Sequence, residues 1–456
     1  MLMKLNEKWL ERGTALIRKA DWIDPELYRR YGVKRGLRND NGTGVLVGLT
    51  TIGNVHGYVM NEGEKQAVPG ELYYRGINVK DIVEADRRDH RFGYEETAYL
   101  LLFGRLPNRK ELDDWNKKLG AYRTLSEGFK ENAIMRNPPK DIMNAMARSV
   151  LFTYAFDDDG DPDDLSLEKC LAQSVDMIGS MATIAAYSYQ TKAHYHYGRS
   201  LILRNPDPTK STAENFLMLS RESPKYTRLE AETLDLALIL HAEHGGGNNS
   251  SFTTHVIASS HSDLYSSMAA SILSLKGARH GGANLRVMRQ MEEIKAKVKD
   301  WTKSAAVAKY LEKIADKKAG DGSGLIYGLG HAVYTVSDPR AQLLKAKARE
   351  LAKEKGREAE MRLFEMIEEL GPAIIKARHP RAEDVCANVD LYSGFVYDML
   401  GLPKDLYTPL FAVARCVSWC AHRMEELVNA GPIIRPAYKP IFHRTPYIEL
   451  KKRARK

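Results

Sequence analysis

At residues 234–251 the chain reads LDLALILHAEHGGGNNSS, and at residues 274–284 it reads SLKGARHGGAN. Ahead of the first histidine–glycine cluster, Leu234, Leu238 and His241 fall at helical spacing within a nearly continuous apolar run. This pattern predicts a buried helix that delivers His241, Glu243 and His244 to its C-terminal end. The three glycines at 245–247 end that helix, because glycine tolerates the left-handed turn that a helix end needs.

The segment between the two clusters is rich in small and apolar residues, and it predicts a second buried helix over 250–275. His280 follows, with glycines on both sides. A histidine between glycines at a helix end has open space and close access to backbone, which suits a ligand better than a core. One histidine near a glycine is more often structural, so the remaining motifs have to decide between these interpretations.

Composition limits the possible classes of protein. The chain has 456 residues, which suggests two domains or one large domain with a subdomain. No stretch approaches 18 uncharged apolar residues, so no membrane span is expected, and the first residues lack the apolar centre of a signal peptide. We therefore predict a cytoplasmic protein. The net charge of +9 fits either nucleic-acid binding or attraction of small polyanionic substrates.

The cysteines predict neither a disulfide framework nor a metal site. Cys170, Cys386, Cys416 and Cys420 contain no C-x-x-C pair. Cys416 and Cys420 share a helix face with His422 nearby, but a zinc ion there would need partners from elsewhere in the chain. We predict no metal.

Helical patterns dominate from Tyr94 onward. Before that point, one amphipathic helix is predicted over 4–20, and residues 44–60 together with ELYYRGINVKDIV at 71–83 predict a small β-meander or hairpin. The charge density changes after residue 284 and becomes apolar again near 394. The chain is therefore predicted to be mainly α, with a large helical domain from 1–284 and 394–456 and a smaller domain from 285–393. A doubly wound α/β fold is disfavoured, because apolar strands do not alternate with helices.

A second glycine-rich motif, GLIYGLGHAVYTVSDPRAQ, occupies residues 324–342. Its glycines expose backbone N–H groups ahead of His331, but their spacing matches no common nucleotide-binding motif. Asp338 and Pro339 then open a helix. Arg340 lies in the first turn, where it could hold a carboxylate with two hydrogen bonds.

The remaining candidates lie in ANVDLYSG at 387–394, TPLFAVARCVSWCAH at 408–422 and GPIIRPAYKP at 431–440. Asp390 fits a helix cap or turn, and it equally fits a general base if it is partly dehydrated. Arg415 lies in an apolar helix and needs an anionic partner, from either the protein or a substrate. Arg435 precedes Pro436 in an extended segment. Together these residues suit a dianionic carboxylic substrate and proton abstraction from a weak carbon acid.

The motifs LHAEHGGGN, GARHGGAN, GLGHAVY–DPRA and NVDLYSG occur in the order found in the citrate synthase family, which the chain resembles from about residue 50 to 436. The resemblance implies a homodimer that condenses acetyl-CoA with oxaloacetate to give citrate and CoA. It implies His280, His331 and Asp390 as catalytic residues. It further implies oxaloacetate binding by His244, Arg340 and Arg415, with Arg435 reaching in from the other subunit, and CoA binding by Leu325, Ile326, Tyr327, Gly328, Leu329 and Gly330.

The resemblance implies acetyl-CoA as a co-substrate, no tightly bound cofactor, and neither a nucleic-acid nor a membrane partner. Gly245 stands where many members have an acidic residue, and Glu243 stands where Asp is commoner. The choice between acetyl-CoA and propionyl-CoA, which would make a 2-methylcitrate synthase, stays open, because one methylene contributes only about 1–3 kcal/mol of discrimination. More remote alternatives are a citryl-CoA lyase and a non-catalytic basic binding protein. Effectors and assembly beyond a dimer are not predicted.

Overall fold

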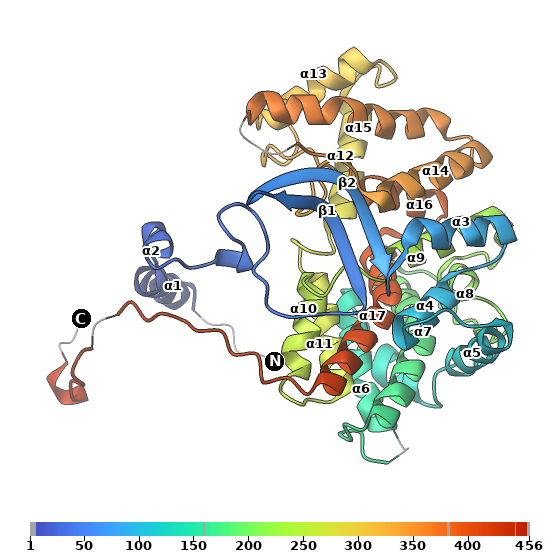
Figure 1. Ribbon diagram of the computed structural model, residues 1–456, viewed down its shortest axis with the longest axis horizontal. Coiled ribbons are helices and arrows are strands. Elements are labelled where there is room, and N and C mark those ends of the chain that lie inside the picture. The colour runs from blue at the N-terminus through green and yellow to red at the C-terminus, as the bar shows by residue number, and fades with distance from the viewer. Residues whose placement is uncertain (1–5, 158–159, 381–383, 443, 454–456) are drawn as a thin grey trace. The chain divides into compact units, whose positions relative to one another are not determined.

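The computed structural model describes residues 6–157, 160–380, 384–442 and 444–453. The chain divides into two compact units, Met1–Leu49 with Met60–Lys65, and Thr50–Val59 with Gln66–Lys456. Figure 1 shows both units, coloured by position in the sequence. The first unit carries α1 (Glu7–Asp21) and α2 (Pro25–Arg30), neither of which contains a buried residue. Helix α1 accounts for the helix predicted over 4–20, of which residues 4 and 5 lie outside the described residues.

Three strands form one small sheet in the order β1 (Gly53–Asn61), β2 (Glu64–Tyr74) and β3 (Ile77–Asn78). Glu62 and Gly63, between β1 and β2, both have positive φ, which is the conformation that a two-residue hairpin turn requires. The predicted hairpin is confirmed, but the strand prediction began too early. Residues 44–52 form no strand, because side chains such as Leu46 and Leu49 are exposed and gain nothing from pairing.

The helices from α3 onward belong to the second unit, and the prediction of a mainly helical fold is confirmed. Their bounds are α3 (Val79–Asp89), α4 (Tyr94–Phe103), α5 (Arg109–Tyr122), α6 (Ile142–Thr153), α7 (Leu167–Tyr197), α8 (Thr212–Ser220), α9 (Arg228–His241), α10 (Asn249–Ala258), α11 (Leu264–Lys276), α12 (Ala283–Lys297), α13 (Ser304–Ala315), α14 (Pro339–Glu354), α15 (Glu358–Arg378), α16 (Val389–Met399) and α17 (Tyr407–Asn429).

Helix α17 lies at the centre of the second unit. Every residue from Tyr407 to Met424 is buried, so the helix is covered on all sides. It packs against α4, α6, α7, α9, α10 and α11. Such a helix can carry polar side chains only where they find partners inside the protein, and α17 carries Arg415, His422 and Arg423 in this buried stretch.

One predicted long helix is interrupted in the structure. The helix predicted over 250–275 is divided into α10 and α11, because the Asp263 side chain accepts a hydrogen bond from Ser266 N at 2.8 Å and starts a new helix. Thr408 does not cap α17, which begins one residue earlier. Its hydroxyl instead donates to the Gly281 carbonyl at 3.0 Å.

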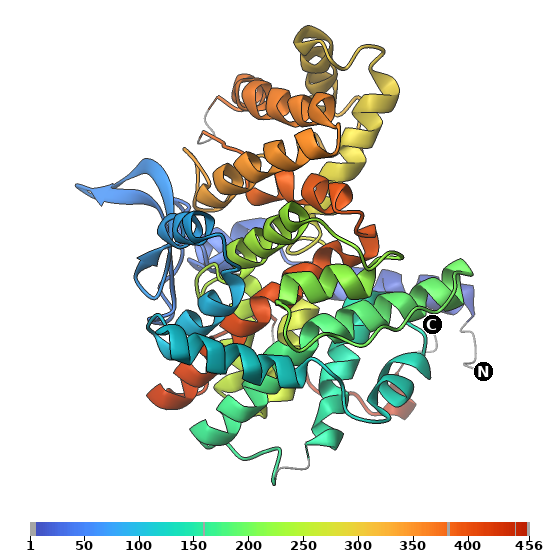
Figure 2. The same cartoon turned by 90° about the vertical axis from the view of Figure 1, so that its right-hand side faces the viewer.

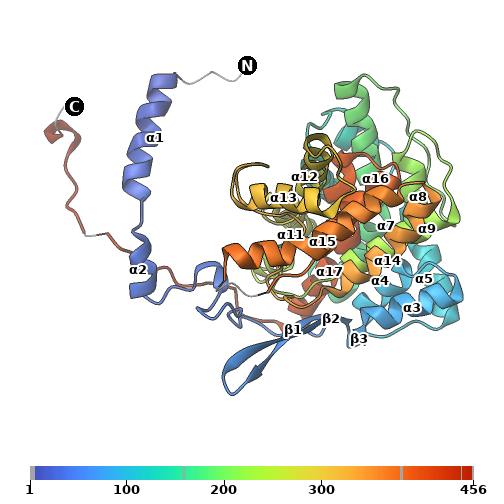
Figure 3. The same cartoon turned by 90° about the horizontal axis from the view of Figure 1, so that it is seen from above.

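Helices α12 to α16 gather at one end of the second unit, as Figures 1 and 2 show, and α12 to α15 face the viewer in Figure 3. Strand β2 reaches this part of the chain at Gly70, whose amide donates to the Ser337 carbonyl at 3.1 Å. A Cβ at Gly70 would lie 2.1 Å from that oxygen, so only glycine fits here. The domain boundaries predicted at residues 284 and 394 stay predictions.

Candidate active site

The first histidine–glycine cluster follows directly after α9. This helix begins with a capping box formed by Thr227 and Glu230, and its last residue is His241. Glu243 and His244 lie beyond the helix, followed by Gly245 with φ of +77°. His244 Nε2 is buried and has no hydrogen-bond partner among the described residues. Burial lowers the pKa of His244 well below its usual value, and the cations Arg340 and Arg415 lower it further, so the imidazole is neutral.

His331 lies against His244. The two ring centroids are 5.0 Å apart, with the rings perpendicular, and Tyr334 stacks on His331 at 4.7 Å. The backbone N–H groups of Val333 and Tyr334 both donate to His331 Nδ1 at 3.1 Å. Because Nδ1 accepts these bonds, the proton of the neutral ring is on Nε2. His331 is therefore held as a donor through Nε2.

His280 has the opposite tautomer. The backbone N–H of Ser250 donates to His280 Nε2 at 3.3 Å, and the Ser250 hydroxyl lies 3.1 Å from the same nitrogen. The neutral ring therefore carries its proton on Nδ1. Burial and then the charge of Arg415 lower the pKa of His280 to about 4. The ring is thus an uncharged hydrogen-bond donor at neutral pH.

Two buried arginines face these histidines. Arg340 is 4% exposed and donates through Nε and Nη2 to both oxygens of Asp338, at 3.0 and 2.7 Å. Asp338 also caps α14, with Pro339 in the first turn, as the sequence predicts. Arg415 is 1% exposed, and its Nε donates to the His241 carbonyl at 2.7 Å. Its Nη2 is buried without a hydrogen-bond partner among the described residues, so this guanidinium can still receive an anion.

Asp390 is the second residue of α16, and the side chain of Asn388 caps that helix by accepting from Asp390 N at 3.0 Å. Asp390 is thus not the cap itself. Burial raises the pKa of Asp390, Arg340 lowers it, and Asp338 raises it again, to about 6. A carboxylate with this pKa is ionised at neutral pH yet is a stronger base than an exposed aspartate.

The glycine-rich loop at 325–330 is joined to the start of α16. Gly330 N donates to the Cys386 carbonyl at 2.8 Å, and Asn388 N donates to the Gly328 carbonyl at 2.9 Å. Gly328 has φ of +89°, and a Cβ there would lie 2.8 Å from the Leu391 side chain. These bonds place the loop beside Asp390. Leu325 is exposed, whereas Ile326 is buried.

A sequence model of the citrate synthase C-terminal domain matches residues 41–437. A citrate synthase of Haloferax volcanii is 34% identical over 408 residues, which cover 89% of this chain and 94% of that protein. The crystal structure of a citrate synthase from Pyrobaculum aerophilum has a TM-score of 0.74 and 31% identity, covering 90% of this chain and 94% of the other.

The chain belongs to the citrate synthase family.

The family assignment and the fold were both predictable from the sequence, and both are confirmed. The chain is a citrate-synthase-type acyltransferase. A second structural relative, from Thermoplasma acidophilum, is a ternary complex of citrate synthase with carboxymethyl coenzyme A and oxaloacetate. It has a TM-score of 0.75 and 26% identity, and the match covers 92% of this chain and 99% of that one. Among the described helices, none is long and apolar enough to cross a membrane.

Most of the predicted site residues of this citrate synthase family member are brought together. His244 contacts His331, and the charges of Arg340 and Arg415 act on His244, while Arg340 also acts on Asp390. Arg435 is different. It is exposed in an extended C-terminal segment, next to Ile434, whose amide donates to the Ser259 hydroxyl at 3.1 Å. The roles of all these residues stay predictions.

Sequence reasoning missed several partners of these residues. Ser250 orients His280, and Tyr334 stacks on His331. Glu243, which is fully buried, accepts from His422 at 3.2 Å. Burial would lower the pKa of His422, but Glu243 and Glu425 outweigh burial and raise it to about 9. The i, i+3 spacing of His422 and Glu425 on one helix was the only local signal for this group.

Proposed function

We propose that this chain condenses acetyl-CoA with oxaloacetate and water to give citrate and CoA, a reaction of the tricarboxylic acid cycle. One observation carries the proposal. Two neutral histidines, His280 and His331, are held by backbone N–H groups in opposite tautomers, near a carboxylate whose pKa is raised to about 6. Neutral donors and a tuned base are what enolate formation at neutral pH requires.

In the proposed reaction, Asp390 removes a methyl proton from acetyl-CoA while the Nδ1–H of His280 donates to the thioester oxygen. The enolate carbon then attacks the carbonyl carbon of oxaloacetate. The Nε2–H of His331 polarises that carbonyl and protonates the alkoxide. Water hydrolyses the resulting citryl thioester, which releases citrate and CoA. The complex of the Thermoplasma acidophilum relative with oxaloacetate and a CoA analogue supports both substrates.

For substrate binding, we assign the carboxylates of oxaloacetate to His244, Arg340 and Arg415. The partnerless Nη2 of Arg415 supports this assignment, because a buried guanidinium group without an anion is costly. Arg340 already pairs with Asp338 and is held in place for a second acceptor. We assign CoA to the loop from Leu325 to Gly330, and we propose a homodimer in which Arg435 of each chain completes the site of the other.

The proposed site residues come from both predicted domains. Arg340, Asp390 and the loop at 325–330 lie within 285–393, whereas His244, His280 and Arg415 lie outside it. We propose that the smaller domain closes over bound oxaloacetate and so completes the acetyl-CoA site. Closure would exclude water before the thioester is activated. The cytoplasmic location stays a prediction from the sequence.

Release of free thiol tests the proposal. Purified protein is given oxaloacetate with acetyl-CoA, and separately with propionyl-CoA, while each thioester alone is the control. Asp390→Asn is a control that should be inactive. His196→Gln, which changes an exposed residue of α7, is a control that should stay fully active. Oxaloacetate-dependent release with the higher kcat/KM for acetyl-CoA is expected. A higher value for propionyl-CoA would make the enzyme a 2-methylcitrate synthase, and no release with either thioester would refute the condensation.

A further inference from the structure

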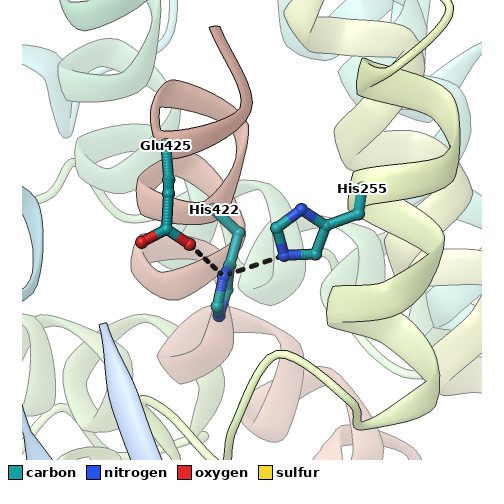
Figure 4. Close-up of side chains that lie close together, drawn as sticks. All are labelled: His255, His422 and Glu425. Carbon is teal, nitrogen blue, oxygen red and sulfur yellow. Dashed lines mark hydrogen bonds and ion pairs between the residues drawn. The ribbon is translucent and has the colours of Figure 1, made fainter. Parts of the chain in front are cut away.

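A second group of histidines lies where α10 packs against α17, apart from the residues assigned to the reaction. His255 comes from α10, whereas His422 and Glu425 come from α17 (Figure 4). His255 Nε2 lies 3.1 Å from His422 Nδ1, and Glu425 Oε2 lies 3.7 Å from the same Nδ1. All three ligand atoms lie within 4.8 Å of one another. Three side chains of metal-binding type thus converge on one point.

We propose that His255, His422 and Glu425 bind a divalent transition-metal ion of the zinc class. Imidazole nitrogen and carboxylate oxygen are ligands that zinc uses, and a site with three protein ligands leaves a fourth position for water. Two ligands on a tetrahedral zinc ion, at bond lengths of about 2.0–2.1 Å, lie about 3.3–3.4 Å apart. Two of the three separations, 3.1 and 3.7 Å, lie on either side of that value, and the third is no more than 4.8 Å.

Both histidines are held as metal-binding histidines usually are. In such sites the ring nitrogen that does not bind metal bonds a carboxylate or carbonyl, which fixes the ring and its tautomer. His255 Nδ1 lies 2.9 Å from Glu426 Oε2, and His422 Nε2 lies 3.2 Å from Glu243 Oε2. The nitrogens left for a metal, His255 Nε2 and His422 Nδ1, are the two that face each other in Figure 4.

Glu425 provides an independent observation. Its side chain is 10% exposed, and its Oε1 accepts from Thr51 N at 2.7 Å and from the Thr51 hydroxyl at 2.9 Å. Its Oε2 is buried without a hydrogen-bond partner among the described residues, and it points toward the ring of His422 (Figure 4). This oxygen faces His422 Nδ1 at 3.7 Å without a hydrogen bond, and a metal ion between the two atoms would bind both.

A glycine and a cavity lie near the three ligand residues. Gly246 lies against both rings, and a Cβ there would come within 3.6 Å of His255 Nε2 and 3.4 Å of His422 Cε1. A cavity lined by Thr50, Thr51 and Ile52 reaches the hydrogen-bond partner of Glu425. The metal would replace the proton that the two imidazoles share, and that proton would be released to solvent.

The cysteines of α17 are not part of this site. Cys416 and Cys420 are fully buried, and the Cys420 thiol contacts the sulfur of Met268 at 3.8 Å. The zinc site weighed from the sequence paired His422 with these cysteines. The structure instead pairs His422 with a histidine that lies 167 residues earlier in the chain.

Metal titration of the whole protein tests the proposal. Protein treated with a chelator and dialysed is titrated with Co²⁺, whose visible spectrum reports tetrahedral coordination, and with Zn²⁺ in competition with a chromophoric chelator. We expect one ion per chain in the wild type and in His196→Gln. His255→Gln and Glu425→Gln should abolish stoichiometric binding. Glu426→Gln, which removes only the partner of His255, should weaken binding about 10- to 100-fold.

Far-ultraviolet circular dichroism and urea unfolding check that each variant folds. Glu425→Gln is the most informative variant, because the amide oxygen of the glutamine can still accept the bonds from Thr51. It keeps the test decisive even if His255→Gln fails to fold. If the wild-type protein binds neither ion stoichiometrically, the proposal is wrong. His255, His422 and Glu425 then only interact with one another and with their neighbours. Equal binding by folded Glu425→Gln would also overturn it, since the ion would then bind elsewhere.

Discussion

The protein holds two groups of buried histidines with opposite electrostatic surroundings. The arginine-flanked cluster, His244, His280 and His331, lies near Arg340 and Arg415. The carboxylate-flanked cluster, His255 and His422, lies among Glu243, Glu425 and Glu426. The pKa of His280 is lowered to about 4, while the pKa of His422 is raised to about 9. His280 is therefore a neutral donor, whereas His422 is a cation, and burial and the charge of His422 lower the pKa of His255 beside it.

The difference shows how charged neighbours decide what a buried histidine does. Burial lowers the pKa in both clusters, so only the neighbours can explain the opposite outcomes. Guanidinium groups keep the first cluster neutral and attract an anion. Carboxylates give the second cluster an affinity for a cation, which is either a proton or a metal ion. Glu243 bonds His422 and immediately precedes His244, so it joins the two clusters.

The largest effect is expected from Asp390→Asn, which removes the proposed base from the arginine-flanked cluster. A general base typically contributes about 10²- to 10⁴-fold to a rate, so turnover should fall by that factor. Oxaloacetate affinity should stay near the wild-type value, because the arginines are unchanged. Thiol release and calorimetry measure the two quantities separately, and wild-type turnover would remove Asp390 from the base role.

The carboxylate-flanked cluster is broken by His422→Gln. His422 and Glu243 are both fully buried, so a neutral residue leaves the Glu243 charge without its cation. Breaking a buried ion pair costs about 3–5 kcal/mol, and the free energy of unfolding should fall by that amount. Urea unfolding with a chelator present measures it. The double variant Glu243→Gln/His422→Gln should recover most of the loss, and an equally unstable double variant would count against the pair.

A smaller effect is expected on the stability of Asp390→Asn, whose free energy of unfolding should rise rather than fall. The pKa of Asp390 is about 6 in the folded protein and 3.8 as its ordinary value. The folded state thus binds the proton more tightly, so stability falls as pH rises from about 4 to 6 and stays lower above. At about 1.4 kcal/mol per pH unit, the variant should gain about 2–3 kcal/mol at pH 7 and almost nothing at pH 4. Urea unfolding at pH 7 and at pH 4 measures this gain in stability. An equal gain at both pH values would exclude the ionisation of Asp390 as its cause.

Features encoded by neighbouring residues were predictable from the sequence. The glycines at 245–247 mark the end of α9, Asp338 and Pro339 mark the start of α14, and the order of the histidine–glycine motifs identifies the family. The sequence also indicated that Arg415 needs an anion. It did not indicate that Arg340 already has one in Asp338, only two residues earlier, because the direction of the side chain depends on the helix geometry.

Contacts between distant segments could not be predicted. His255 and His422 are 167 residues apart, and no local pattern connects them. The break between α10 and α11 was missed for a different reason. The run of small residues at 250–275 looks helical throughout, and Asp263 starts a new helix only because its side chain turns back to Ser266 N. The strands were misplaced because the exposed apolar residues Leu46, Val47 and Leu49 resemble a strand in sequence alone.

The most direct test of the electrostatic contrast is the binding of oxaloacetate to Arg415→Gln, measured by titration calorimetry. Arg423→Gln is the matched control. It removes another buried arginine of α17, whose guanidinium bonds the carbonyls of Ala258 and Ser262 instead. We predict that Arg415→Gln weakens binding by about 2–5 kcal/mol, because it removes a desolvated charge partner, while folded Arg423→Gln keeps the wild-type affinity. Wild-type affinity in Arg415→Gln would contradict the assignment of the arginine-flanked cluster to a carboxylate substrate.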